Sequence, residues 1–292
     1  MIDFHCHILP GLDDGAVTID DSIAMAQALA DFGYTTVCCT PHCIRGYYDI
    51  TPKRVREATL MLQADLDNAD INLELWPGME YMLDECFAEV ADDLQPLGDT
   101  RLILCEAPPL AHPGVVLESL ELIIAKGYVP LIAHPERTQY FNTMFTKPED
   151  LEEKRKEPSE NREGAKAESF LRRLFAPRPL RFATRRDNSP AVIEKVLPKG
   201  ILFQANLGSF SGFYGEAVQR RAYELLKLGV YCALASDLHD GSSAEKVLIH
   251  DKIEYNPLLK KLSEFDGVAT EVIFDTLLKK TLLVKLFSTM QV

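Results

Sequence analysis

The amino-acid sequence predicts an α/β fold in which parallel strands alternate with helices in one barrel. Short apolar, β-branched runs recur along the chain, and segments with helical periodicity separate them. Strands that are joined through helices run parallel and are linked by right-handed crossovers. The 292 residues suffice for one α/β barrel, which often takes about 250 residues, so we expect a single domain over 1–292. The predicted strands are 2–7, 35–39, 72–76, 101–105, 129–133, 201–204 and 230–235.

The helices are predicted from their start and stop signals. Thr18 stands three residues before Asp21 as a capping box, and Gly33 ends that helix. Thr51 and Pro52 open a second helix over 53–68, with apolar residues at helical spacing. Further helices are expected over 115–126 and 217–228, each ended by a glycine, and a helical region over 266–287.

One segment breaks this alternation. Residues 146–187 are polar, mixed in charge at first and rich in arginine later. We expect an insertion between the fifth and sixth strands that is partly disordered. A mobile surface loop is the favoured reading of the arginines, and docking of an anionic partner is the alternative.

Composition excludes several classes of protein. The formal net charge of -13 disfavours nucleic-acid binding. The N-terminus has no basic start followed by an apolar stretch, and no apolar run reaches the ~18 residues that span a membrane. Seven cysteines, an odd number in a long chain, fit reduced thiols. We therefore expect a cytoplasmic protein that is not membrane-spanning.

Metal-ligating residue types recur where the predicted strands end. His5 and His7 are two apart on one strand, so their rings point to the same side. The carboxyl ends of parallel strands in a barrel meet at one rim, where active sites form. Imidazoles and carboxylates crowded at one rim need cations, and this donor set suits Mn, Fe or Zn. Nine ligands are too many for one ion, so two or three are predicted. The candidate ligands are His5, His7, Asp14, His42, Glu80, Glu106, His134, Asp237 and His239.

A second phosphatase pattern overlaps this set. Cys39 and Arg45 are spaced as in the C-x5-R loop of cysteine-dependent tyrosine phosphatases. That loop uses several backbone N–H groups to hold phosphate, and Pro41 removes one of them. The segment has no glycine, and His42 is better used as a ligand. We therefore expect metal-dependent chemistry and no role for a thiolate nucleophile.

The ordered motifs HCHILPGLDDG, TPHC, PGME, IAHPER and ASDLH closely resemble the polymerase-and-histidinol-phosphatase superfamily. Within it, they resemble the manganese-dependent protein-tyrosine phosphatases of bacterial capsule and exopolysaccharide loci. The resemblance covers 1–140 and 200–241. It implies a distorted (β/α)7 barrel with a trinuclear Mn²⁺ site. Metal one would take His5, His7, Glu80 and Asp237; metal two Glu80, Glu106 and His134; metal three Asp14, His42 and His239.

The resemblance also implies an activity. His42, Asp237 and Arg137 would serve catalysis, with Arg137 against the substrate phosphate, in direct hydrolysis without a covalent intermediate. The family's second arginine, after the SD-x-H motif, is absent here, and Arg45 or Lys246 is the candidate replacement. The implied substrate is a phosphotyrosine protein, the tyrosine-rich tail of an autophosphorylating polysaccharide-export kinase. Alternatives are a phosphatase of a small ester such as histidinol phosphate, a nuclease, and a non-catalytic metal- and phosphotyrosine-binding regulator.

Overall fold

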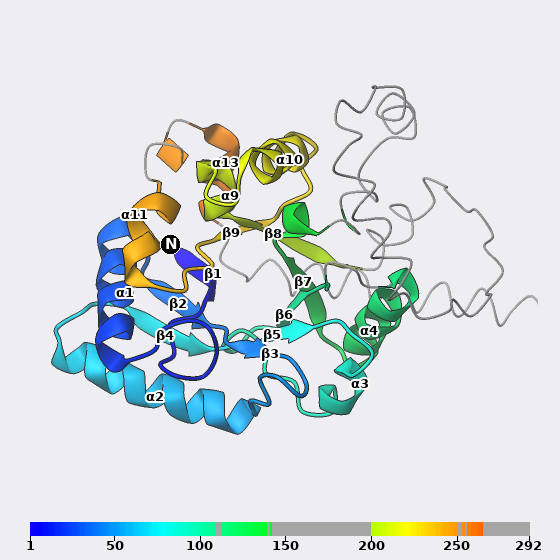
Figure 1. The fold of residues 1–292 in the computed structure, drawn as a ribbon, viewed down its shortest axis with the longest axis horizontal. Coiled ribbons are helices and arrows are strands. Elements are labelled where there is room, and N and C mark those ends of the chain that lie inside the picture. Colours follow the sequence, from blue (N-terminus) through cyan, green and yellow to red (C-terminus); the bar gives the residue numbers. More distant parts are fainter. Residues whose placement is uncertain (109–111, 139–140, 142–199, 250–252, 255, 265–292) are drawn as a thin grey trace, which may run out of the picture.

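The computed structural model describes residues 1–108, 112–138, 141, 200–249, 253–254 and 256–264 (Figure 1). The predicted insertion at 146–187 and the predicted helical region at 266–287 lie outside these residues. Within the described ranges, the fold is mixed α/β with parallel sheets, as the sequence predicts.

Nine strands form two sheets within the described ranges. The first has the order β1-β2-β4, with β1 (Ile2–Cys6), β2 (Thr36–Cys39) and β4 (Glu74–Pro77). The second has the order β3-β5-β6-β7-β8-β9, and every pairing in both sheets is parallel. Its strands are β3 (His42–Cys43), β5 (Glu80–Met82), β6 (Leu102–Glu106), β7 (Val129–Ala133), β8 (Leu202–Asn206) and β9 (Ala233–Ala235). Each of the seven predicted strands has a counterpart here.

The chain passes from the first sheet to the second at two breaks. The break between β2 and β3 contains Pro41, which has no N–H to donate to a sheet. The break between β4 and β5 contains Gly78, where an added Cβ would lie 2.6 Å from Leu97 Cδ2. His42 and Glu80 follow β2 and β4, as the sequence predicts. Each opens a short second strand, and the two residues pair in register across β3 and β5.

The two ends of the strand order lie side by side. Cys6, at the end of β1, forms a parallel bridge with Leu238, just beyond β9. The Asp237 N–H donates to the His5 carbonyl at 2.8 Å, and the His7 N–H donates to the Leu238 carbonyl at 3.0 Å. These bonds place the ends of β1 and β9 together.

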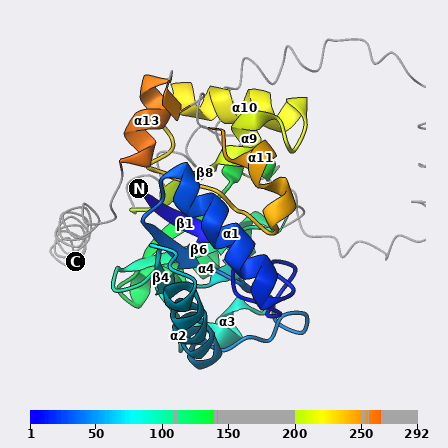
Figure 2. The same ribbon diagram turned by 90° about the vertical axis from the view of Figure 1, so that its left-hand side faces the viewer.

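Helices surround the strands, as Figures 1 and 2 show. The predicted capping box at Thr18 and the C-cap at Gly33 are confirmed on α1. On α2, the Thr51 side chain accepts the Arg54 N–H, and the predicted apolar face is buried. Asn206 caps α9, and its side chain accepts the Gly208 N–H. The helices are α1 (Ile19–Phe32), α2 (Pro52–Asn68), α3 (Phe87–Val90), α4 (Pro113–Ala125), α9 (Leu207–Ser211), α10 (Glu216–Lys227), α11 (Ala244–Val247) and α13 (Pro257–Ser263), with 3-10 turns η1 (Pro135–Arg137) and η3 (Gly241–Ser243).

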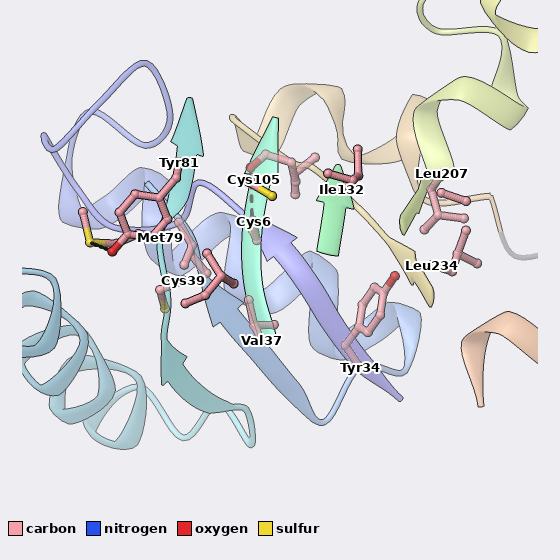
Figure 3. Close-up of a cluster of buried hydrophobic side chains, with 14 of the residues drawn as sticks. Cys6, Tyr34, Val37, Cys39, Met79, Tyr81, Cys105, Ile132, Leu207 and Leu234 are labelled. Carbon is pink, nitrogen blue, oxygen red and sulfur yellow. Dashed lines mark hydrogen bonds between the residues drawn. The ribbon is translucent and has the colours of Figure 1, made fainter. Parts of the chain in front are cut away.

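Strands such as β2, β7 and β9 are buried on both faces, as parallel strands between helices usually are, whereas β4 is partly exposed. One core cluster includes Cys6, Val37 and Ile132, which Figure 3 shows along their strands. A second cluster includes Phe4 and Leu131 from the opposite face of β1 and β7. All seven cysteines are free, as the sequence predicts. Among the helices that the structure describes, none is both long enough and apolar enough to cross a membrane.

Candidate metal centre

The structure brings all nine predicted ligand residues to one place. Their side-chain donor atoms fall into four overlapping groups, and the atoms of each group lie within 4.8 Å of one another. These residues come from the carboxyl ends of strands or the loops that follow, and from the short strands β3 and β5. The groups are His7, Asp14, His42 and His239; His5, His134 and Asp237; His5, His7 and Glu80; and His42, Glu80 and Glu106.

The middle of the centre is formed by two histidines and two carboxylates that are fully or nearly fully buried. His5 Nε2 lies 3.1 Å from Glu80 Oε2 and 3.1 Å from Asp237 Oδ1. His7 Nε2 lies 3.3 Å from the same Asp237 oxygen and 2.9 Å from His5 Nε2. The sequence predicts that His5 and His7 share a face while Cys6 packs in the core, and this is confirmed. The carboxylates of Glu80 and Asp237 therefore lie close to the Nε2 atoms of both His5 and His7.

Glu80 also joins the centre to its second side. His42 Nδ1 lies 3.0 Å from Glu80 Oε2 and 3.3 Å from Glu106 Oε1. His134 Nε2 lies 3.1 Å from Glu80 Oε1. Both oxygens of the buried Glu80 carboxylate thus face imidazoles, which fits a bridging role between two ions.

The outer edge of the centre is more open to solvent. His42 Nε2 and His239 Nε2 lie 3.5 Å and 3.7 Å from Asp14 Oδ1. The Asp14 side chain is 54% exposed, and the His239 side chain is 29% exposed. The His7 and His239 rings stack with centroids 3.9 Å apart, so this edge is continuous with the middle. Solvent therefore reaches the centre at this edge.

Backbone strain is concentrated at two of these residues. Within the described ranges, three non-glycine residues have a left-handed φ, namely Asp70, His134 and Asp237. Such residues are uncommon, and they gather at functional sites where the surrounding structure holds them. His134 directly follows β7, and Asp237 stands two residues after the end of β9.

The donor atoms fit divalent cations. Within the described ranges, the buried His42 Nδ1, Glu80 Oε2 and His134 Nδ1 make no hydrogen bond of good geometry, although His42 Nδ1 and Glu80 Oε2 lie 3.0 Å apart. A buried polar atom without a partner is costly, and a bound cation removes that cost for an atom that points to it. The groups contain imidazole and carboxylate and no thiolate, which is typical of Mn, Fe and catalytic Zn sites.

The electrostatics show how strongly the buried carboxylates attract positive charge. Burial opposes protonation of His7, but its hydrogen bonds to Asp13 and Asp237 outweigh this and raise its pKa to about 10. Burial likewise opposes protonation of His42, and the charges of Glu80 and Glu106 raise its pKa to about 12. Despite burial, the neighbouring imidazoles hold the pKa of Glu80 well below its usual value. Protons or divalent cations can satisfy such carboxylates.

Two side chains that the sequence motifs did not indicate orient the central histidines. Asp13 Oδ2 accepts a hydrogen bond from His7 Nδ1 at 2.7 Å and from the His42 backbone N–H at 2.9 Å. Although Asp13 is buried, these bonds lower its pKa to about 2. Gln204 Oε1 lies 3.3 Å from His5 Nδ1. Asp13 is the neighbour of Asp14 in the LDDG motif. The motif indicates that this loop takes part in the centre, but it does not show that Asp13 orients His7 while Asp14 is the candidate ligand.

Arg137 reaches the centre through Asp237. Arg137 Nη1 donates to Asp237 Oδ2 at 2.6 Å, while Oδ1 of the same carboxylate faces His5 and His7. Asn206 Nδ2 also donates to Oδ2 at 2.6 Å. The guanidinium lies over the Tyr214 ring, 4.4 Å from its centroid. Asn206 and Tyr214 were not predicted to take part, and they hold both Asp237 and Arg137 in place.

Arg45 lies in a different setting from Arg137. Its side chain is 49% exposed and pairs with Asp49 at 2.7 Å and Glu89 at 3.0 Å. Both acceptors are carboxylates, so Arg45 is engaged in a surface ion-pair network. Lys246, the other candidate replacement for the missing arginine, is exposed on α11. A phosphate role for either residue stays a prediction.

The cysteine pattern has no reactive thiol. Cys39 is fully buried, and burial raises the pKa of its thiol to about 12. A thiolate nucleophile needs a lowered pKa and access to substrate. Cys39 packs in the core beside β1 and β4 instead (Figure 3).

Comparison with known proteins identifies the family. The family described as capsular polysaccharide synthesis, CpsB/CapC, matches residues 1–156. The tyrosine-protein phosphatase YwqE of Bacillus subtilis (strain 168) is 32% identical over 245 residues, which cover 82% of this chain and 78% of YwqE. The tyrosine-protein phosphatase CpsB of Streptococcus pneumoniae is 27% identical over 139 residues, which cover 47% of this chain and 57% of CpsB.

A solved structure from the same group of proteins has a similar fold. It comes from crystal structures of YwqE from Bacillus subtilis and CpsB from Streptococcus pneumoniae, described as unique metal-dependent tyrosine phosphatases. The match has a TM-score of 0.67 and 27% sequence identity, and it covers 94% of both chains. The family match, the identity to YwqE and the shared fold agree with the resemblance that the sequence motifs carry. The chain therefore belongs to the CpsB/CapC family of capsular polysaccharide synthesis proteins.

Proposed function

We propose that this chain is a metal-dependent protein-tyrosine phosphatase. One observation carries the proposal: nine imidazole and carboxylate side chains lie together in one centre, and Arg137 donates a hydrogen bond to one of them, Asp237. A divalent-ion site beside a guanidinium is suited to a phosphate ester, because both bind anionic oxygens. The names of YwqE and CpsB as tyrosine-protein phosphatases support the same reaction.

The nine residues would hold two or three divalent ions, and manganese is the proposed metal. Glu80 is the candidate bridge, because its oxygens face His5, His42 and His134. When bound, such ions supply Lewis-acid activation of water and stabilisation of phosphate charge. We also propose that the two sheets form one distorted seven-stranded barrel, in which β2 with β3 and β4 with β5 each count as one interrupted strand. Hydrogen bonds that join the ends of β1 and β9 support this closure.

The protein's own residues would bind and orient the ester. Arg137 is 34% exposed, so its guanidinium can reach an anion while Nη1 stays on Asp237. A guanidinium offers five N–H donors, and the non-bridging phosphate oxygens accept them. His42 and Asp237 would be ligands of the ions that bind the substrate phosphate. The buried His5 and His7 rings keep their geometry because Gln204 and Asp13 fix the far nitrogens.

The proposed substrate is phosphotyrosine on a protein, in particular the tyrosine-rich tail of a polysaccharide-export kinase in the cytoplasm. The CpsB/CapC family description, capsular polysaccharide synthesis, supports this biological setting. A phenolate leaves more easily than an alkoxide because the tyrosine pKa is near 10. The site therefore needs less help from a general acid with this substrate.

The test is hydrolysis by metal-stripped protein with and without added Mn²⁺. We expect no turnover of a phosphotyrosine peptide without metal, recovery with Mn²⁺, and loss of most of kcat in His7→Ala. His112→Ala is the matched control, since His112 is an exposed helix cap on α4. Histidinol phosphate is assayed in parallel. Faster turnover of histidinol phosphate than of the peptide would contradict the protein-phosphatase assignment.

A further inference from the structure

Two pairs of aromatic residues contact the candidate metal centre from different loops. Tyr47 and Tyr48 lie in the loop after β3, and Phe213 and Tyr214 lie between α9 and α10. In each pair the second ring contacts a residue of the centre, and the first ring packs edge-on against the second. Because the arrangement occurs twice, at positions 166 residues apart in the sequence, it is not explained by one local turn.

The inner rings lie against charged or ligating side chains. The Tyr48 ring is stacked with the His42 ring at 10°, with centroids 5.9 Å apart. The Tyr214 ring lies under the Arg137 guanidinium, and its hydroxyl is 3.4 Å from Asp237 Oδ2. His7 contacts His42, the partner of Tyr48, and also Asp237, the partner of Tyr214. The two inner rings are therefore linked through residues of the centre.

The outer rings are exposed. Tyr47 is 75% exposed and meets Tyr48 at 82°, with centroids 4.7 Å apart. Phe213 is 44% exposed and meets Tyr214 at 83°, with centroids 5.0 Å apart. The other large exposed apolar side chains in the described part of the chain are not aromatic. Both exposed aromatic rings therefore adjoin the centre, although nothing in the folding of the core requires them there.

We propose that Tyr47 and Phe213 bind the aromatic ring of the substrate and make the site selective for aryl over alkyl phosphate esters. This inference rests on the proposed phosphatase function. An ester whose phosphate lies against Arg137 carries its leaving group toward the exposed rim, and an aryl group can pack there against these rings. Edge-to-face and offset pairs of aromatic rings, with centroids 4.5–7 Å apart, are favourable beyond the area they bury.

The test compares phenyl phosphate with glycerol phosphate as substrates of the Mn²⁺-loaded protein. Tyr47→Ala and Phe213→Ala should each lower the ratio of kcat/KM for phenyl phosphate to that for glycerol phosphate. We expect about two- to tenfold, because an aromatic pair contributes about 0.5–1.5 kcal/mol and 1.4 kcal/mol is tenfold. Leu60→Ala and Leu228→Ala are matched controls, since these side chains are 73% and 58% exposed on α2 and beside α10. The controls should leave the ratio unchanged.

Binding and rescue measurements separate ring recognition from damage to the loops. Affinity for phenylphosphonate relative to methylphosphonate, measured by calorimetry, should fall with the kinetic ratio. Tyr47→Phe and Phe213→Tyr keep a ring and should retain both ratios. An active double variant with unchanged ratios would overturn this inference alone. Wild-type protein that binds metal but hydrolyses neither ester would overturn the proposed function, and this inference with it.

Discussion

Asp13 fixes the orientation of His7, with 2.7 Å between the carboxylate Oδ2 and the imidazole Nδ1. This bond turns Nε2 of the ring toward Asp237 and Glu80. The same carboxylate accepts backbone N–H groups from His42 and Gly15. One buried side chain thus ties the loop after β1 to the start of β3 and sets the geometry between them.

Replacing Asp13 should weaken metal binding without removing a ligand. Asp13→Asn loses the charge that favours the N–H on His7 Nδ1, so we expect about 10–100-fold weaker Mn²⁺ binding, the usual effect of losing such a partner. Isothermal titration calorimetry measures it. Asp20→Asn is the control, since Asp20 is exposed on the first turn of α1. Unchanged affinity in Asp13→Asn would show that His7 needs no support from this carboxylate.

A methyl group at Gly15 should disturb His7 directly. An added Cβ would lie 2.1 Å from the His7 carbonyl oxygen and 2.5 Å from its Cβ, so either the loop or β1 must shift. We expect Gly15→Ala to lower the free energy of unfolding by about 3 kcal/mol or more, beyond the usual cost of overpacking. Chemical denaturation measures this.

The control for Gly15 separates the steric contact from backbone strain. Gly127→Ala has open space around the new Cβ but a left-handed φ of 89°, so it should cost only about 1 kcal/mol. Equal costs in the two variants would mean that the close approach of Gly15 to His7 does not constrain the fold.

Arg137 should act on phosphate binding and transition-state charge. Arg137→Ala is expected to raise KM for phenyl phosphate and to lower kcat/KM by about 10²-fold or more, the effect of losing a charge-assisted donor at the reacting group. Arg137→Lys should restore little, because an ammonium cannot reproduce the planar contact with Tyr214. Full activity in the lysine variant would contradict a role for guanidinium geometry.

Removing the Cys39 thiol should leave catalysis intact. The side chain is buried in the core, so Cys39→Ser should keep kcat/KM within about twofold while lowering the melting temperature, because a hydroxyl is buried there. Phosphatase kinetics and thermal denaturation are measured on the same Mn²⁺-loaded sample. Complete loss of turnover in a folded variant that still binds metal would favour the thiolate route.

Most of the fold could be predicted from the sequence because the signals for strands and helices are local. Alternating faces on β1 placed His5 and His7 together, and the caps at Thr18 and Thr51 located two helices. The breaks at Pro41 and Gly78 were harder to interpret. β2 ends at Cys39, and β3 begins at His42, directly after Pro41. Such a short second segment looks like a loop in sequence, although it pairs with β5 in the second sheet.

The supporting side chains of the centre could not be predicted in the same way. Asp13 and Asp14 are adjacent and chemically identical, and only the loop path shows which one is buried against His7. Asn206 reaches Asp237 from the end of the neighbouring strand β8, and Tyr214 reaches it from the segment between α9 and α10; neither has a spacing that indicates a role. Such contacts depend on tertiary packing, which a motif does not encode.

The central claim is that these distant residues hold several divalent ions, and counting the ions tests it most directly. The protein is loaded with Mn²⁺, passed through a desalting column and analysed by elemental mass spectrometry against protein concentration. We predict two or three ions per wild-type chain and at least one fewer in His7→Ala, with His112→Ala matching wild type. Wild-type protein that retains no ion, or the same number with and without His7, would contradict the account.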